Sequence, residues 1–308
     1  MKHLFIINPA AGSRDRTLEC SREIVQLCRD LDYRVEISKG PGDCRRLANA
    51  AARSGEEYRI YACGGDGTLN EVAAGAAGYG NAAVTVWAGG SGNDFVRLFS
   101  EPRAFCHLAR LLDAEETAFD MICCNDSLAL NICSVGLDAR IGTDVANYKR
   151  LPLLQGFWAY AASAVVNVVR SVSQPLRVTL CGQTRDEEMT MVCVCNGRYY
   201  GGGFMPVAEA RMDDGVLNTL VVKKVSRLTF MKFVNPYSKG QYYKFPHLAR
   251  CSTPKVIRIR SEKPDIVTCL DGECITSDDV TIQLSDKRLN FFGPAGCSCN
   301  RTARKPLI

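Results

Sequence analysis

The chain has 308 residues, of which 46% are hydrophobic and 23% are charged, and its formal net charge is +5. This composition is typical of a globular protein with one large domain or two ordinary domains, and it excludes a disordered chain. No stretch approaches the roughly 18–20 consecutive apolar residues that a membrane-spanning helix requires.

Cysteine usage and the N-terminus both indicate a reducing cytoplasm. The sixteen cysteines show no CxxC spacing and the three histidines lie far apart, which argues against a zinc site. We interpret most of these cysteines as small buried hydrophobic residues. The apolar run at 4–7 is short and is followed at once by Asn8-Pro9, which is unlike a signal peptide.

Strands and helices alternate through the first 120 residues. Hydrophobic runs predict strands at 2–7, 33–38, 58–62 and 82–87. Helices are predicted at 43–54 and 69–77, and an earlier helix follows the loop at 8–14, with apolar positions at Ile24, Val25, Leu27 and Leu31. This alternation predicts an α/β domain with a parallel sheet and helices on both faces.

Three of the predicted strands end in small, polar, glycine-rich loops, at 8–12, 64–68 and 89–94. Ligands bind beyond the carboxyl ends of the strands in such sheets. The three loops together therefore predict a ligand site at this edge. The alternative is that all three are only tight connections between a strand and a helix.

The central loop lies within residues 63–72, between a buried strand and a helix. Three glycines within four positions let the backbone approach a ligand without Cβ clashes. The N–H groups at the start of the helix form a phosphate site. Asp66 adds a carboxylate where a magnesium-bound phosphate would lie. The alternative is a tight turn in which Asp66 caps the helix.

Better-known phosphate motifs are absent. The sequence contains no Gly-Lys pair and hence no Walker A loop, and Asn70 stands where the dinucleotide fingerprint has its third glycine. The protein-kinase motif set is also missing. The central loop is therefore a phosphate site of another kind, if it is one.

From about residue 120 the pattern changes to short alternating runs, at 127–133, 176–181, 189–195, 217–223, 256–260 and 280–284. This spacing is typical of an antiparallel sandwich or barrel. A helix predicted at 153–172, with Phe157, Trp158 and Tyr160, interrupts it. We predict a first domain at 1–120, to which 287–308 returns through the run at 288–292, and a second at 121–286. The tail from Cys297 is basic and is expected to be mobile.

These motifs, in this order, resemble those of the diacylglycerol kinase catalytic family, which includes soluble bacterial diacylglycerol kinases and the sphingosine and ceramide kinases. The likeness covers nearly the whole chain and is carried by residues 8–12, 64–72, 90–95, 131 with 136–139, 196–197, 200–204, 206–208, 213–217 and 271–273. Ala11 replaces the family's usual Ser, and Ser91 replaces its usual Thr. The resemblance implies a diacylglycerol kinase-like or NAD kinase-like α/β domain followed by a mainly antiparallel β-sandwich.

The resemblance also implies roles for single residues. ATP would be held by Asn8, Pro9, Ala10, Ala11, Gly12, Ser38, Gly64, Gly65, Asp66, Gly67, Thr68, Leu69, Asn70 and Ser91. Asp66, Asp94 and Asp120 would belong to the acidic network that organises the catalytic Mg²⁺, and Glu273 would be the general base. A second, structural metal would be held by Asp214 with the carbonyls of Arg211 and Val216. Such a site suits phosphoryl transfer, which requires positioning and charge neutralisation.

The resemblance implies an ATP-dependent lipid kinase that phosphorylates the hydroxyl of a lipid such as diacylglycerol, giving phosphatidic acid and ADP. The alternative is an NAD kinase or another small-molecule kinase, because the Gly-Gly-Asp-Gly-Thr turn also occurs there. A nucleic-acid-binding module is a third interpretation, but no motif supports it, and we expect no nucleic-acid partner. A homodimer is left open.

A basic segment predicts peripheral contact with the inner face of the membrane. Residues 223–263 contain eleven Lys or Arg and one acid, Glu262, which gives a net charge of +10. Each basic residue near an anionic surface contributes about 1 kcal/mol, and aromatic residues favour the interface. Six aromatic residues lie among the basic ones: Phe230, Phe233, Tyr237, Tyr242, Tyr243 and Phe245. The alternative is an ordinary solvated basic face.

Overall fold

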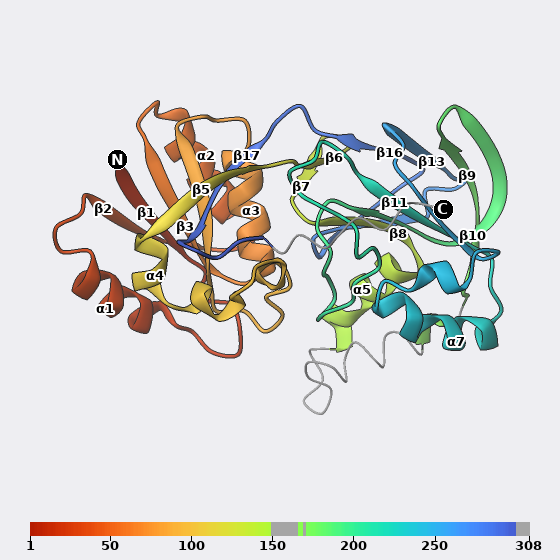
Figure 1. Cartoon of the computed structure of the whole chain (residues 1–308), viewed down its shortest axis with the longest axis horizontal. Coiled ribbons are helices and arrows are strands. Elements are labelled where there is room, and N and C mark those ends of the chain that lie inside the picture. The colour runs from red at the N-terminus through yellow and green to blue at the C-terminus, as the bar shows by residue number, and fades with distance from the viewer. Residues whose placement is uncertain (149–165, 169–170, 300–308) are drawn as a thin grey trace. The chain divides into compact units, whose positions relative to one another are not determined.

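The computed structural model describes residues 1–148, 166–168 and 171–299 (Figure 1). The chain divides into two compact units: unit 1 is Met1–Met121 with the segment that returns from Asp286, and unit 2 is Ile122–Ser285. The helix predicted at 153–172 lies largely outside the described residues, as does the tail from residue 300. Among the described residues, no helix is long and apolar enough to cross a bilayer.

Unit 1 is built on a six-stranded sheet in the order β2-β1-β3-β4-β17-β5. Its strands are β1 (Lys2–Ile7), β2 (Tyr33–Ile37), β3 (Tyr58–Gly64), β4 (Ala82–Ala88), β5 (Ala114–Phe119) and β17 (Leu289–Pro294). All neighbouring pairs are parallel except β17 with β5. The parallel sheet and the return of 288–292 to it are confirmed, whereas the antiparallel edge strand β5 was not predicted.

The helices of unit 1 form two groups. Their bounds are α1 (Thr17–Leu27), α2 (Asp43–Arg53), α3 (Asp66–Ala76), η1 (Phe95–Leu98), η2 (Pro102–Cys106) and α4 (Leu108–Leu112). The helix α3 packs on α2, β3 and β4, whereas α4 contacts α1, β4 and β17 (Figure 1). Every residue of β4 is buried, as expected for a parallel strand that is covered on both faces.

Two details of unit 1 differ from expectation. Of the apolar positions predicted for the first helix, Ile24 is buried, but Val25, Leu27 and Leu31 are exposed. The short helix instead turns Cys20 and Ile24 inward, so its buried stripe is narrow. The first residues of the predicted tail are also held: the N–H of Cys297 donates to Pro294, and the N–H of Ser100 donates to the carbonyl of Ser298, 2.9 Å away.

Unit 2 is an antiparallel sheet in the order β15-β14-β8-β10-β9-β13-β16-β6-β7, with β11 between β10 and β12. Its strands are β6 (Ile122–Cys124), β7 (Ser127–Ala129), β8 (Ile132–Gly136), β9 (Gln174–Leu180), β10 (Gln183–Cys195), β11 (Asn218–Lys223), β12 (Ala249–Ser252), β13 (Val256–Arg260), β14 (Ile266–Leu270), β15 (Glu273–Ser277) and β16 (Asp279–Leu284). The predicted antiparallel second domain is confirmed.

Alternate residues of β10 separate two apolar layers in unit 2. Val192 and Val194 pack into one cluster with β13 and β16, because successive side chains of a strand point to opposite faces. Cys193 and Cys195 pack into the other cluster, against the helix α7 (Arg227–Ser238). The helix α5 (Leu137–Tyr148), the short η3 (Tyr242–Lys244) and the helical residues 166–168 also belong to this unit.

The aromatic residues of the basic segment do not lie on its surface as a group. Phe230, Phe233, Tyr237 and Tyr242 are buried in the second apolar layer, which corrects the expectation that they face a membrane. Phe230, Phe233 and Tyr237 form the buried face of α7, whereas Tyr242 lies on η3. The sequence count of aromatics could not distinguish a core face from an interface.

Candidate active site

The three glycine-rich loops of unit 1 meet at the carboxyl ends of β1, β3 and β4. A Cβ atom on Gly12, whose φ is +81°, would lie 2.5 Å from the carbonyl oxygen of Gly89, and one on Gly90 would lie 2.5 Å from the Cα atom of Gly65. Both distances are too short for any side chain, so the loops touch through their glycines. The predicted convergence of these loops is therefore present.

Asn8 fastens the first loop to the central one. Its Nδ2 donates to Oγ1 of Thr68 at 3.0 Å, and its Oδ1 accepts from the N–H of Ala10 at 3.0 Å. The first bond links the end of β1 to the first turn of α3. It explains why an Asn at the end of β1 accompanies a Thr in the central turn.

The start of α3 is open to a ligand. Gly65 is the N-cap and supplies no side-chain cap, so no side chain of the helix start occupies the N–H groups that carry the positive end of the dipole. Asp66 is the first residue of the helix, and the alternative in which Asp66 caps the helix does not apply. This arrangement suits a phosphate.

The carboxylate of Asp66 binds the loop that follows β4. Its Oδ2 accepts from the N–H of Asp94 and its Oδ1 from the N–H of Phe95, both at 3.0 Å. The Cβ position of Gly92 lies 3.1 Å from Oδ2 of Asp66 and 3.9 Å from Oδ2 of Asp94. Two carboxylates thus converge on one point, and carboxylate oxygens are the ligands that Mg²⁺ prefers.

The other two predicted acids of this unit are buried ion-pair partners. Asp94 is 6% exposed and its Oδ1 lies 3.1 Å from Nε of Arg97. Asp120, 5% exposed, follows β5 and its Oδ1 lies 3.0 Å from Nε of Arg288. Because Arg288 directly precedes β17, the returning segment supplies the cation that holds Asp120.

The remaining predicted nucleotide residues lie on the same loops and at the start of α3, except for Ser38. Ser38 follows β2 and is buried, and its N–H donates to the carbonyl of Ile7. Leu69 is buried, so only its backbone can face a ligand. The amide Oδ1 of Asn70 is buried with no hydrogen-bond partner among the described residues, which leaves it able to accept from a bound nucleotide.

Glu71 has a structural role that sequence reasoning missed. Its carboxylate accepts from the N–H groups of Gly42, Cys44 and Arg45 at 3.0, 3.1 and 3.4 Å. It therefore caps the N-terminus of α2 from the neighbouring helix, where a negative charge is stabilising. Asn70 and Glu71 are neighbours on α3 and therefore point in different directions. Only one side of α3 faces the loops, so the sequence could have suggested that the two residues have different roles.

In unit 2, the two acids of the Asp-Gly-Glu motif are separated. Asp271 and Gly272 form the turn between β14 and β15, with φ of 47° and 96°. The carboxylate of Asp271 accepts from the N–H groups of Leu130, Asn131 and Ile132, at 2.6 to 3.2 Å. Asp271 thus holds the chain entering β8, while Glu273 begins β15 and is exposed.

The predicted second metal site is a turn between β10 and β11. Gly215 has φ of +70°, and the side chain of Arg211 pairs with Asp213 at 3.1 Å. No group of three His, Cys, Asp or Glu side chains among the described residues is arranged to hold a metal. A metal at this turn would therefore depend on Asp214 and on backbone carbonyls such as those of Arg211 and Val216, an oxygen set that Mg²⁺ accepts.

A buried carboxyl group in unit 2 was not singled out from the sequence. Asp138, on the first turn of α5, is 8% exposed, and its Oδ2 accepts from the hydroxyl of Tyr200, whose oxygen lies 2.7 Å from that of Tyr237. Burial raises the pKa of Asp138 to about 6, although the hydrogen bond from Tyr200 acts in the opposite direction. Neighbouring Leu137 belongs to the apolar layer of α7.

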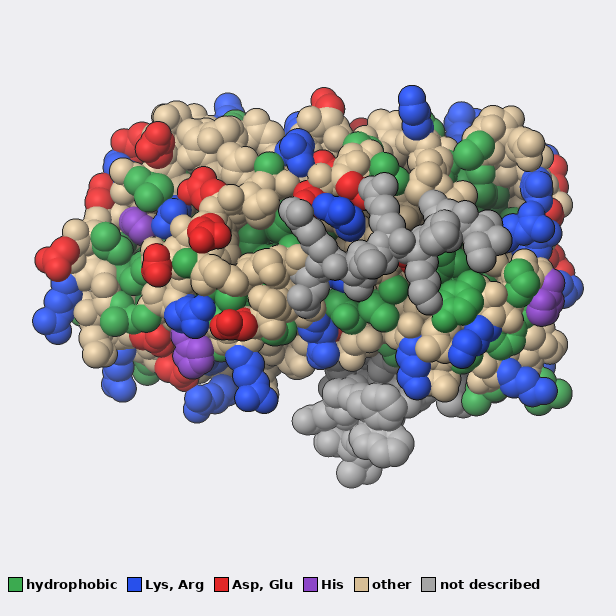
Figure 2. Space-filling model, viewed as in Figure 1, with side chains coloured by type: hydrophobic (Ala, Val, Ile, Leu, Met, Phe, Trp, Pro, Cys, Tyr) green, Lys and Arg blue, Asp and Glu red, His purple; other side chains and the backbone are tan. Residues whose placement is uncertain are grey.

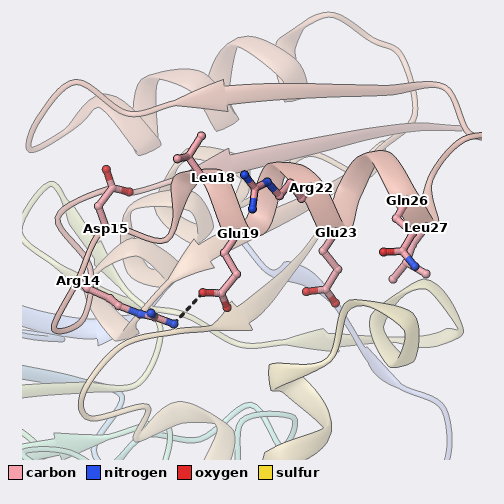
Figure 3. A pocket seen from close by; sticks show the side chains of 8 residues that line it. All are labelled: Arg14, Asp15, Leu18, Glu19, Arg22, Glu23, Gln26 and Leu27. Carbon is pink, nitrogen blue, oxygen red and sulfur yellow. Dashed lines mark hydrogen bonds and ion pairs between the residues drawn. The ribbon is translucent and has the colours of Figure 1, made fainter.

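A surface hollow along α1 is not the site. It is lined by eight residues, among them Arg14 and Glu19, which form an ion pair of 2.9 Å (Figure 3). None of the predicted site residues lines it. Its charges are of both signs and lie on the surface of α1 and of the two charged residues before it, so it lacks the fixed polar groups of a ligand site.

Two family models together match most of the chain. The family described as "Diacylglycerol kinase catalytic domain" matches residues 2–124, which contain the three glycine-rich loops. The family described as "YegS C-terminal NAD kinase beta sandwich-like domain" matches residues 131–293, more than half of the chain, and includes Asp138, Asp271 and Glu273.

Several relatives and solved structures are similar to the chain. A protein of Staphylococcus epidermidis named as a lipid kinase is 27% identical over 280 residues, which are 89% of each chain. A YegS-like lipid kinase of Pseudomonas aeruginosa is 29% identical over 61% of this chain and 62% of its own length.

Solved structures share the fold. A crystal structure described as a diacylglycerol kinase of Bacillus anthracis has a TM-score of 0.73 at 24% identity and covers 96% of this chain and 98% of its own. An NAD kinase of Archaeoglobus fulgidus, solved with ATP, has a TM-score of 0.51 at 15% identity, with 96% and 94% covered. With both family models matched in order, the chain belongs to the diacylglycerol kinase family and is a kinase.

Proposed function

We propose that this kinase uses ATP to phosphorylate the hydroxyl of a lipid such as diacylglycerol, giving phosphatidic acid and ADP. The observation that carries the proposal is the meeting of three glycine-rich loops around the open N-terminus of α3, beside Asp66 and Asp94. Backbone N–H groups and a helix dipole there can hold the phosphates of ATP. The names of the relatives support a lipid as the acceptor.

The acids of unit 1 provide the charge that a magnesium nucleotide requires. Asp66 and Asp94 are the residues that would hold Mg²⁺, either directly or through its waters, and Asp120 would complete this network. Bound Mg²⁺ neutralises the charge that develops on the transferred phosphoryl group. The hydrogen bonds from Asp94 and Phe95 fix the orientation of the Asp66 carboxylate before any ligand arrives.

The acids of unit 2 act on the lipid. Glu273 accepts the proton of the attacking hydroxyl, because it is the motif carboxylate whose partner Asp271 is already committed to three backbone N–H groups. Asp138 with Tyr200 is a polar pair beside an apolar layer. We assign this pair the contact with the polar end of the lipid, whose acyl chains suit apolar surroundings.

The outer face of α7 is our proposed membrane contact. Leu228 and Met231 are 79% and 69% exposed, and they share one helical face with Lys232 and Asn235. Figure 2 shows Lys and Arg side chains beside hydrophobic ones over α7. Two exposed apolar residues on a basic face match an anionic bilayer, in which the apolar side chains enter the interface and the cations meet lipid headgroups.

One assay tests the acceptor. Purified protein is incubated with labelled ATP and magnesium and with diacylglycerol, monoacylglycerol, ceramide, sphingosine or NAD in turn. We expect label in phosphatidic acid, and about 10²-fold less of it or lower still with the Glu273→Gln protein. Label in NADP alone would replace the lipid proposal with the NAD kinase alternative, and label in another lipid would reassign the acceptor.

A second assay tests the membrane face. The variant Leu228→Glu/Met231→Glu should lose binding to anionic vesicles, and Lys239→Glu/Lys244→Glu should weaken it in a salt-dependent manner. Leu18→Glu is the matched control, because Leu18 is 74% exposed but lies on α1. Equal partitioning of the wild type onto neutral and anionic vesicles would contradict the proposal. So would unchanged binding of the first variant together with a change of oligomeric state, which would indicate a homodimer contact.

A further inference from the structure

Two cysteines face each other across the hairpin that carries Glu273. The antiparallel register of β14 and β15 pairs Leu270 with Glu273 and Cys269 with Cys274. A two-residue turn, Asp271-Gly272, closes the hairpin, so the pair flanking the turn is the hydrogen-bonded one and the next pair is not. Residues of a non-hydrogen-bonded pair have Cα atoms about 4.5 Å apart, which lies within the range of about 4.4–6.8 Å that a disulfide requires.

Both thiols point to the same spot on α5. The Cβ position of Gly142 lies 3.4 Å from Sγ of Cys269 and 3.9 Å from Sγ of Cys274. The thiol of Cys274 also contacts the carbonyl oxygen of Ala139, 3.8 Å away. The two sulfur atoms therefore lie on one face of the hairpin, as a bond between them requires, and next to the helix that carries Asp138.

This pair differs from the other close thiols in being accessible. All sixteen cysteines are free thiols, and Cys193 and Cys195, whose sulfurs lie 3.6 Å apart, are buried. Cys269 and Cys274 are only partly buried. The hydrogen bond from Cys269 lowers the pKa of Cys274 to about 7, whereas the pKa of Cys269 is raised. A thiolate is the reactive form of cysteine, so Cys274 is the attacking residue of the pair.

We propose that Cys269 and Cys274 are a reversible oxidation site, at which a peroxide converts the two thiols into a disulfide across the β14–β15 hairpin. The Cys274 thiolate attacks one peroxide oxygen, the O–O bond breaks, and hydroxide leaves and takes up a proton to form water. The Cys269 sulfur then attacks the sulfur of the resulting sulfenic acid, forming the S–S bond, and the sulfenic hydroxyl leaves as water with the Cys269 proton. Overall, two thiols and one peroxide give one disulfide and two waters, and a dithiol reverses the reaction.

The disulfide would affect the proposed phosphoryl transfer because Cys274 directly follows Glu273. Closing an S–S bond of about 2.05 Å draws the two sulfur atoms together beside that residue and away from their present contacts with α5. This consequence for activity rests on the proposed function of Glu273. A displacement of a catalytic group by about 1 Å costs up to about 10²-fold in rate, so we expect oxidation to lower kcat by about 10- to 100-fold.

The test uses the full chain treated with hydrogen peroxide, then alkylated and digested with trypsin. Arg260 and Lys287 enclose both cysteines, and Lys263 precedes a proline, so one peptide carries the pair and no other cysteine. We expect that peptide to lose two hydrogen atoms and to escape alkylation, and dithiothreitol to restore it together with kcat. The variant Cys269→Ser/Cys274→Ser should keep its kcat in peroxide, whereas Cys106→Ser/Cys181→Ser, which removes two exposed thiols, should behave as wild type.

The peptide measurement is independent of any enzyme assay. Full alkylation of both cysteines after peroxide treatment would overturn the proposed site, whatever the acceptor of the kinase proves to be. A disulfide that forms without a change in kcat would overturn its link to Glu273. If no lipid is phosphorylated, slower hydrogen exchange in residues 266–277 after oxidation supports the fastened hairpin, and unchanged exchange contradicts it.

Discussion

Each unit ties a motif aspartate to backbone N–H groups of a distant segment, but the two units use the device differently. In unit 1, Asp66 binds the N–H groups of Asp94 and Phe95 and also lies among the loops proposed to hold phosphate. In unit 2, Asp271 binds the chain entering β8, and the neighbouring Glu273 is exposed. In unit 1, the Asp66 carboxylate therefore has both a structural role and a proposed chemical role. In unit 2, Asp271 has the structural role and Glu273 has the proposed chemical one.

The largest effect is expected for Glu273→Gln. If Glu273 has only a chemical role, kcat falls by about 10²–10⁴-fold, the usual worth of a general base, while stability and the affinities for ATP and lipid stay close to wild type. Steady-state kinetics and a melting curve measure both. Glu262→Gln, an exposed acid of the same unit, is the control. A Gln variant with wild-type kcat and pH profile would remove Glu273 from the mechanism.

Asp66→Ala should lose activity and stability together. We expect kcat to fall by about 10²–10³-fold, as when one preorganised electrostatic group is removed. The free energy of unfolding should fall by about 2 kcal/mol, because two backbone N–H groups lose a charged acceptor. The exposed Asp30→Ala is the control. A variant that loses kcat but keeps the wild-type stability would show that the bonds to Asp94 and Phe95 contribute nothing.

Asp271→Ala should mainly destabilise unit 2. Three backbone N–H groups lose their acceptor, and Ala is strained at the φ of 47°, so the free energy of unfolding should fall by about 3 kcal/mol. Asp271→Asn tolerates that φ and keeps one acceptor oxygen, so it should lose less. Urea unfolding distinguishes the two. Wild-type stability of both proteins, with a large loss of kcat, would instead make Asp271 the general base.

The last prediction concerns Asp138 and the pH dependence of stability, with no expected loss of kcat. Its folded pKa, about 6, lies above the ordinary aspartate pKa of 3.8, so the protonated form is favoured by folding. Its contribution to stability is complete below about pH 4 and is lost as the pH rises through 6, by about 3 kcal/mol. Asp138→Asn should therefore lose less stability than wild type between pH 4 and 7 in thermal melts. Parallel pH profiles for the two proteins would contradict the buried titration.

The α/β unit was more predictable than the antiparallel one, for a reason visible in its contacts. Strands β1, β3 and β4 are continuous apolar runs, and their loops carry their own glycines, so local sequence marks them. Asp66 and its partners at 94 and 95 lie 28 and 29 residues apart. Asp271 and Leu130 lie 141 residues apart, and such a pairing leaves no local signal.

The features that local sequence patterns did not predict are those that depend on tertiary contacts. The aromatic residues of 223–263 were interpreted as part of a membrane contact, because an aromatic side chain is the same in a core and at an interface. The pair Asp138–Tyr200 needs the fold to bring together residues 62 apart. The fold class is confirmed, while the roles of Glu273, of Asp214 and of the nucleotide residues stay predictions.

The position of β17 near the end of the sequence affects how unit 1 folds during synthesis on the ribosome. β4 cannot pair with β17 until the ribosome has synthesised about 200 further residues. That synthesis takes on the order of 10–40 s at ordinary elongation rates. All of unit 2 emerges in that interval. Unit 1 of the nascent chain therefore carries an open parallel edge beside hydrophobic strands, and a chaperone that shields β4 at this stage would protect the chain more than one acting on the finished protein.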